Sequence, residues 1–264
     1  MVMKTKIKLF HKGYISKIYL IGYMNKKFLK KYFIKRTNST VYKNINIENI
    51  FENEIRRIIF LNSVNVKDII TPRIININRA RLWYSQEYYD LIPFNTYMIL
   101  NSNLFFTNKN IFHLFEQLGR YLAKLHNNPK GMIHGDLNRK NMLFIKDKIF
   151  ICDPSSLDNQ MYNKPYLDLF RVINNIYSYN LFVRVLICNK DKIILSFLRG
   201  YFSGANIKLN KDILKKRLIE HINEIDVLMS KGLIGYIKFY IIHILNKLFT
   251  YNIKNNKYGW LNEI

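Results

Sequence analysis

The order of the predicted elements indicates an α+β fold, in which a small antiparallel sheet with one helix precedes a mostly helical part. Short strand-like runs fill most of the first 90 residues, and strongly periodic helices dominate afterwards. A chain of 264 residues is long enough for one large domain or for two lobes. We expect an N-terminal lobe at residues 1–88 and a C-terminal lobe at residues 89–264, joined near residues 88–93.

Composition narrows the class of protein further. Apolar residues make up 49% of the chain, which excludes a disordered protein, and no uninterrupted run of about 18 apolar residues predicts a membrane-spanning helix. The first residues lack the apolar core of a signal peptide, and two cysteines suggest no disulfide framework. These features favour the cytoplasm, with the inner face of a membrane as a second possibility.

The formal net charge of +24 has two interpretations. It indicates an anionic partner, such as a nucleotide, a phosphorylated glycan, a membrane surface or nucleic acid. It also follows from an A- and T-rich genome, whose codons favour Lys, Asn, Ile, Tyr and Phe. The lysines are scattered along the chain, so we attribute most of the charge to composition.

The N-terminal strands and helix are predicted from local patterns. Alternating runs at Lys6–Phe10 and Lys17–Tyr23 predict a hairpin around a single-glycine loop, and a third strand is expected at Phe28–Arg36. Apolar residues on one broad face predict a helix over Asn49–Asn62. Two further strands are expected near residues 71–75 and 82–89.

The C-terminal part is predicted to be helical around one polar segment. The helix expected at Asn110–His126 carries an apolar residue every three or four positions, and two later stripes predict helices near residues 214–225 and 234–248. The last of these helices also carries several lysines. It could therefore lie on a membrane surface, although such a stripe more often belongs to a core.

One polar segment between these helices concentrates the chemistry. Asp136, Asn141 and Asp153 stand among apolar residues, and the runs Met142–Ile145 and Ile149–Cys152 predict two strands joined by a Lys-Asp-Lys turn. The turn would bring Asn141 and Asp153 together beside a further carboxylate. Mg²⁺ prefers such hard oxygen ligands, so the spacing is typical of a metal site for phosphoryl transfer.

The segment H-G-D-L-x-x-x-N, followed by an aspartate twelve residues after the asparagine, resembles the catalytic and metal-binding loops of the protein-kinase-like fold. Glycine after the histidine, and the preceding L-G-R-Y-L-A-K-L-H, resemble the branch of aminoglycoside phosphotransferases, choline and fructosamine kinases, and lipopolysaccharide-sugar kinases. The resemblance implies the two-lobed kinase fold, with ATP and Mg²⁺ as cofactors. Asp136 would be the catalytic residue, and Asn141 and Asp153 would hold the metal.

The same resemblance assigns residues of the first lobe to the nucleotide. Lys35 would contact the phosphates, with Lys30 and Lys31 as neighbouring alternatives. Glu54 would pair with that lysine, and Glu48 and Glu52 are its alternatives. Further nucleotide contacts are implied for four residues: Gly13 and Ser16 in the first hairpin, and Glu87 and Tyr89 at the hinge.

Two further residues would shape the catalytic loop. His134 is expected to hydrogen-bond to the backbone, and Asp168 is expected to tie the loop to the helical lobe. Gly135 stands where many protein kinases have an arginine that reads a phosphorylated loop. Regulation by such phosphorylation is therefore not expected.

These features predict an ATP-dependent phosphotransferase that moves the γ-phosphate to a hydroxyl of a sugar or other small molecule, with an envelope glycan as one option. The alternatives are an atypical protein kinase and a nucleotide-binding scaffold without turnover. Nucleic acid is not expected as a partner, because the basic residues do not cluster with aromatics in the sequence. Peripheral membrane contact remains an option, and the sequence does not define the oligomeric state.

Overall fold

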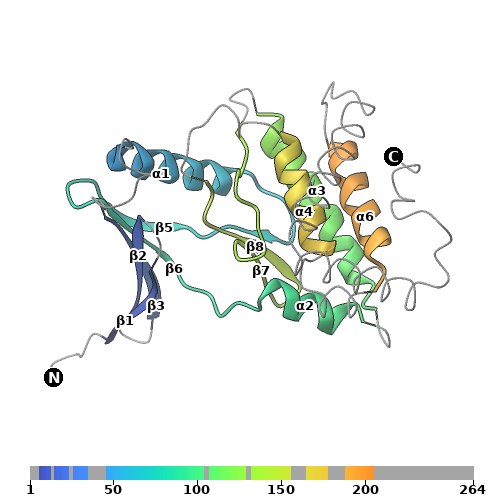
Figure 1. Ribbon diagram of the computed structural model, residues 1–264, viewed down its shortest axis with the longest axis horizontal. Helices are drawn as coiled ribbons and strands as arrows, with labels where there is room; N and C mark the ends of the chain where they lie inside the picture. Colours follow the sequence, from blue (N-terminus) through green and yellow to red (C-terminus); the bar gives the residue numbers. More distant parts are fainter. Residues whose placement is uncertain are drawn as a thin grey trace, which may run out of the picture.

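The computed structural model describes residues 6–12, 15–23, 26–34, 46–103, 107–128, 132–155, 165–177 and 188–204. Figure 1 shows a five-stranded sheet with one helix at one end, the other helices at the opposite end, and a second, smaller sheet between them. This arrangement confirms the expected α+β fold, with the antiparallel sheet first and the helices later. The lobe boundary near residue 88 stays a prediction.

The five-stranded sheet has the order β1-β2-β3-β6-β5, and all its pairings are antiparallel. Its strands are β1 (Lys6–Lys12), β2 (Ser16–Tyr23), β3 (Lys26–Phe33), β5 (Ile74–Asn78) and β6 (Trp83–Glu87). Since side chains alternate along a strand, directly paired residues share one face of this sheet. The third strand was predicted over Phe28–Arg36, and it begins two residues earlier and ends three residues earlier.

Helix α1 (Ile47–Ser63) covers one face of this sheet. Its N-terminus is capped by Asn46, whose side chain accepts hydrogen bonds from the backbone N–H groups of Glu48 and Asn49. Phe51 packs edge-on against Phe33, with ring centroids 5.3 Å apart. A small core forms there from Phe33, Ile50, Phe51, Ile55, Ile58 and Tyr84. We call this covered side the inner face of the sheet, and the opposite side the outer face.

The C-terminal end of α1 belongs to the second lobe instead. Leu61 and Val66 are buried in the larger hydrophobic core. Helix α3 (Asn110–His126) holds this segment, because Tyr121 Oη donates to the Leu61 carbonyl at 3.4 Å and Lys124 Nζ to the Asn65 carbonyl at 3.1 Å. The predicted bounds of α3 are confirmed.

A three-stranded sheet of order β4-β8-β7 connects the two regions. Strands β7 (Met142–Ile145) and β8 (Lys148–Ile151) form the predicted hairpin. The two-residue strand β4 (Ile69–Ile70) pairs with β8 in parallel, and this pairing was not predicted. Residues 69–70 therefore join the second sheet although they precede the expected boundary.

The larger core lies among helices α2 (Phe94–Asn101), α3, α4 (Pro165–Tyr177) and α6 (Lys190–Gly204). Helices α3 and α6 approach so closely that two glycines meet the opposite backbone. A Cβ at Gly119 would lie 2.0 Å from the Phe197 carbonyl oxygen, and one at Gly200 would lie 2.0 Å from that of Glu116. These positions therefore admit no side chain at the present helix spacing.

Gly119→Ala is expected to lower the free energy of unfolding by about 3 kcal/mol or more, because the new methyl group must push α6 away from α3. Gly204→Ala is the matched control. Its Cβ would meet Ala123 Cβ at 3.1 Å, so we expect a loss below about 1 kcal/mol. Chemical denaturation of both variants gives the comparison, and equal losses would contradict the close helix crossing.

No helix among the described residues is long and apolar enough to cross a membrane. The helices predicted near residues 214–225 and 234–248 lie outside the described residues.

Candidate active site

Asp136, Asn141 and Asp153 converge as their spacing predicts. The Asn141 side-chain amide donates to Asp136 Oδ2 at 3.0 Å, to the Asp136 carbonyl at 2.9 Å and to the Asp153 carbonyl at 3.3 Å. Asn141 precedes β7 and Asp153 follows β8, so the hairpin brings them together. Asp153 has a φ of 54°, a left-handed conformation that non-glycine residues adopt at few positions.

Asp168, near the start of α4, fixes the loop that carries Asp136. Its carboxylate accepts hydrogen bonds from the backbone N–H groups of His134 at 2.7 Å and Gly135 at 2.9 Å, and it lies 3.2 Å from His126 Nε2. Burial alone would raise the pKa of Asp168, but hydrogen bonding and the nearby histidines lower it below its usual range. The expectation that Asp168 ties the loop to the helical lobe is confirmed.

His134 holds the loop from the other side, as predicted. Its Nε2 lies 3.1 Å from the Cys152 carbonyl, and its Nδ1 lies 3.3 Å from the backbone nitrogen of Asp136. A carbonyl requires a donor and a backbone N–H requires an acceptor, so these contacts define the neutral tautomer protonated at Nε2. Burial lowers the pKa of His134, which agrees with that assignment.

We expect the protein to lose stability when the pH falls below about 6.5, the pKa of an unperturbed histidine. Below this pH, His134 binds a proton in the unfolded chain but not in the folded protein, where it is buried. The free energy of unfolding therefore falls by up to about 1.4 kcal/mol per pH unit for this one group. Denaturation at about pH 7.5 and about pH 5.5 measures the loss. His134→Gln should reduce the slope, and an unchanged free energy of unfolding in the wild type would contradict the assignment.

Among the described residues, the lysine that pairs with Glu54 is Lys31, which was one of the two alternatives to the predicted Lys35. Lys31 Nζ lies 2.7 Å from Glu54 Oε1 and 2.6 Å from Asp153 Oδ1. Strand β3 ends at Phe33, and Lys31 lies inside it, on the inner face that α1 covers. Lys35 itself lies outside the described residues.

The charges around Lys31 form a bridge between three elements. Lys31 lies on β3, Glu54 on α1 and Asp153 after β8, and Tyr84 Oη on β6 also donates to Glu54 Oε1 at 2.6 Å. Burial alone would lower the pKa of Lys31, but the two carboxylates outweigh it and raise that pKa above its ordinary value. Lys31 therefore stays an ammonium ion, which is the form that can neutralise phosphate charge.

Gly135 is required by its backbone and by a neighbouring arginine. Its φ is +77°, which glycine adopts without steric cost. A Cβ there would lie 3.0 Å from Ser155 Cβ and 3.2 Å from Arg57 Nη1 of α1. The buried Arg57 guanidinium thus brings α1 against the loop that carries Asp136, and the sequence did not predict this contact.

Arg171 on α4 is a second residue that sequence reasoning missed. Its Nη1 lies 3.0 Å from Asp136 Oδ1 and also donates to the Gly135 carbonyl. Arg171 follows Asp168 by three residues, a spacing that places both on one side of a helix. That spacing was the available signal, since Asp168 was already expected to face the loop.

The structure describes three of the four other residues that were predicted to contact the nucleotide. Gly13 lies outside the described residues, and Ser16 is buried at the start of β2. Glu87 ends β6, its backbone N–H donates to the Arg73 carbonyl, and its side chain accepts a hydrogen bond from Tyr89 Oη at 2.6 Å. The Tyr89 ring packs against Phe150 of β8, at 5.2 Å between centroids. Their contacts with a nucleotide stay predictions.

The donor set at Asn141 and Asp153 fits a magnesium ion. Nδ2 makes all the hydrogen bonds described for the Asn141 side chain, which leaves its amide oxygen as a ligand beside the Asp153 carboxylate. Mg²⁺ is usually bound by one or two such protein oxygens, together with phosphates and water. Among the described residues, no cluster of three or more His, Cys, Asp and Glu offers another kind of metal site.

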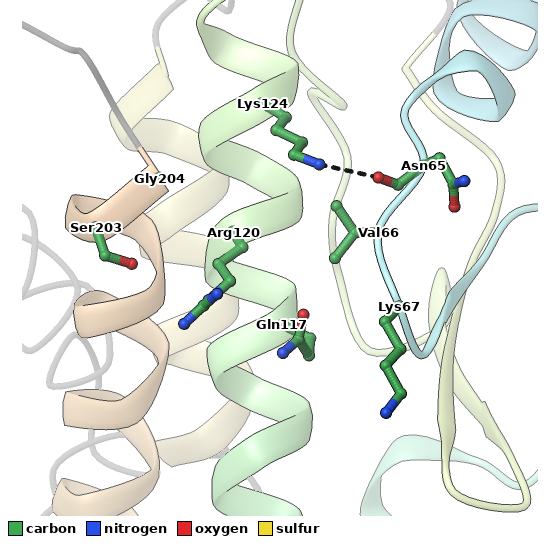
Figure 2. A pocket seen from close by; sticks show the side chains of 8 residues that line it. All are labelled: Asn65, Val66, Lys67, Gln117, Arg120, Lys124, Ser203 and Gly204. Atoms are coloured by element: carbon green, nitrogen blue, oxygen red, sulfur yellow. Dashed lines mark hydrogen bonds between the residues drawn. The ribbon is translucent and has the colours of Figure 1, made fainter.

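A separate cavity of about 470 Å³ lies along α3. Figure 2 shows it between the segment after α1, helix α3 and the end of α6, and its lining includes Lys67, Arg120 and Lys124. Lys124 is held by the Asn65 carbonyl, and Arg120 pairs with Glu116 at 2.6 Å. None of the predicted site residues lines this cavity, so we separate it from the candidate active site.

No protein-family model and no curated protein matches this sequence. Solved structures do match. WaaP, in a complex with acyl carrier protein, is 11% identical, has a TM-score of 0.54, and covers 84% of this chain and 89% of its own. The PknI kinase domain of M. tuberculosis is 12% identical, has a TM-score of 0.44, and covers 65% of this chain and 70% of its own. With the two-lobed architecture described above, the chain has a protein-kinase-like fold.

Proposed function

We propose that this protein is an ATP-dependent phosphotransferase that moves the γ-phosphate to a hydroxyl of a sugar or other small molecule. The observation that carries the proposal is the single constellation formed by Asp136, Asn141, Asp153, Lys31 and Glu54. It combines a carboxylate for the acceptor, oxygen ligands for a metal, and a buried cation for the phosphates. Phosphoryl transfer needs these parts in one place.

Each residue has a role that follows from its contacts. Asp136 would orient the acceptor hydroxyl and take its proton as the oxygen bonds to phosphorus and the bond to the leaving ADP oxygen breaks. Lys31, held by Glu54, would face the phosphates, and the backbone of residues 87–89 would hold the adenine edge. Asn141 and Asp153 would hold Mg²⁺, which neutralises phosphate charge when bound. Placement and charge thus supply the rate enhancement.

The experiment is product analysis by mass spectrometry after incubation with ATP, Mg²⁺ and a panel of sugars, aminoglycosides, glycan fragments and proteins. A mass increase of one phosphate on an acceptor, absent with Asp136→Asn, would support the proposal. A protein acceptor labelled in preference to every small molecule would favour the atypical protein kinase. ATP binding without turnover under all conditions would favour the scaffold.

Arg171 adds a testable part to this mechanism. The side chains of Arg171 and Asp136 are 31% and 43% exposed. An ion pair with this much exposure to solvent contributes little to stability. The contact instead fixes the direction of the Asp136 carboxylate and of the loop carbonyl before it. Arg171 is therefore a positioning residue.

Arg171→Ala is expected to lower kcat by up to about 10²-fold, the cost of a misplaced catalytic group, while KM for ATP changes little. Arg171→Lys should recover part of kcat, because a cation still reaches the carboxylate. Steady-state kinetics of the three proteins separate kcat from KM. A wild-type kcat in Arg171→Ala would contradict the positioning role.

A further inference from the structure

The outer face of the five-stranded sheet combines apolar and basic side chains in an unusual way. Strand pairing places Ile7 beside Ile21 and Phe28, and Leu9 beside Tyr19 and Lys30. Ile7 and Leu9 are 64% and 47% exposed, and neither hydrophobic core of the described chain includes the apolar residues of this face. The same face carries Lys12, Lys17, Lys26 and Lys30.

The charge of this region is strongly one-sided. No Asp or Glu occurs before Glu48, so strands β1, β2 and β3 contain only basic and neutral residues. Scattered lysines elsewhere are interspersed with carboxylates, which a composition bias explains. In these three strands no carboxylate accompanies the lysines, so the whole surface attracts anions. On the outer face, the first acidic side chain along the sheet is Glu87, paired with Phe28.

We propose that the outer face of this sheet docks on an anionic membrane surface. Exposed aliphatic side chains insert among acyl chains, and lysines around them meet lipid phosphates, which together make a peripheral membrane site. The proposal is independent of the phosphotransferase reaction. A second copy of this chain does not suit the surface, because self-association would place lysines against lysines.

Single-stranded nucleic acid, the other large polyanion, fits the geometry less well. Bases bind protein sheets by stacking on free aromatic faces. Here Lys30 Nζ lies 3.4 Å from the centroid of the Trp83 ring, and Tyr19 packs edge-on to Tyr32 at 5.6 Å. One face of Trp83 is thus covered, and exposed aliphatic residues such as Ile7 and Leu9 add nothing to base stacking.

The test is sedimentation of the full-length protein with phosphatidylcholine vesicles, with or without phosphatidylglycerol. We expect binding only to the anionic vesicles. Ile7→Gln with Leu9→Gln should weaken it at least about tenfold, and Lys17→Gln with Lys26→Gln should weaken it about fivefold for each lysine. Matched controls should bind like the wild type: Ile59→Gln with Leu100→Gln, which are 55% and 61% exposed, and Lys67→Gln with Lys109→Gln.

A second readout does not depend on the folding of these variants. The chain has two tryptophans, so in a Trp260→Phe background the fluorescence reports Trp83 alone. We expect brominated lipids in anionic vesicles to quench it.

Several results would overturn the proposal. These are no binding by the wild type, binding that ignores lipid charge, equal losses in the matched controls, and Trp83 fluorescence that brominated lipids leave unquenched. Loss of single-stranded oligonucleotide binding, with vesicle binding intact, in the outer-face variants would assign the surface to nucleic acid instead.

Discussion

Asp136→Asn is expected to remove most turnover, with a loss of about 10²- to 10⁴-fold in kcat, while the affinity for ATP stays within a few-fold of the wild type. The Asp136 carboxylate is expected to act on the acceptor hydroxyl and not on the nucleotide. An interaction that forms mainly in the transition state appears in the rate and not in ground-state binding. The measurement is kcat on any accepted substrate beside a fluorescence titration with ATP.

The fold should survive this substitution. The Asp136 side chain is 43% exposed, so replacing one oxygen by an amide is expected to change the free energy of unfolding by about 1 kcal/mol or less. Asp147→Asn, in the exposed turn between β7 and β8, is the matched control and should keep full turnover. Wild-type turnover in Asp136→Asn would refute the proposed mechanism.

Lys31→Met should lower both stability and activity. The side chains of Lys31 and Glu54 are 9% and 3% exposed, so the variant leaves a buried carboxylate without its cation. Losses of about 3–5 kcal/mol are typical when one partner of a buried pair is removed. The phosphates would also lose the cation that we propose for them, so ATP affinity and kcat should fall together.

A second substitution separates these two effects. The double substitution Lys31→Met with Glu54→Gln also removes the unpaired charge of the Glu54 carboxylate. Much of the lost stability should therefore return, while turnover stays low. Lys35→Met is the matched control, since the structure gives the contact with Glu54 to Lys31. Thermal melts and kcat for the three variants provide the comparison. If Lys35→Met lost as much turnover as Lys31→Met, our assignment of the phosphate lysine would be wrong.

The choice between these lysines shows where sequence reasoning reaches its limit. Every second residue of a strand lies on the same face, so a long strand would place residues 31, 33 and 35 on one face. The sequence does not reveal that β3 ends at Phe33. The β7–β8 hairpin was predictable because its apolar runs flank a short turn. The polar residues at its two ends then follow from the spacing alone.

Contacts between residues far apart in the sequence were the other features that could not be predicted. Helix α3 was predicted with its observed bounds because its apolar stripe is continuous, whereas β4 has two residues and pairs with a strand about 80 positions later. The Arg57 contact with Gly135 likewise joins α1 to a loop far along the chain. No local pattern encodes such pairs, because they depend on how the lobes pack.

The two ends of α1 are anchored unequally, and this sets how the helix can move. Residues 61–66 are fixed in the larger core and by α3, whereas the sheet holds the other end through Lys31 and Phe33. We therefore expect helix α1 to pivot near Leu61. Any motion that parts Glu54 from Lys31 must tilt the helix, with the largest displacement near Asn46. Separation of these two side chains is therefore expected to be a rotation of α1 about its C-terminal end and not a sliding of the whole helix.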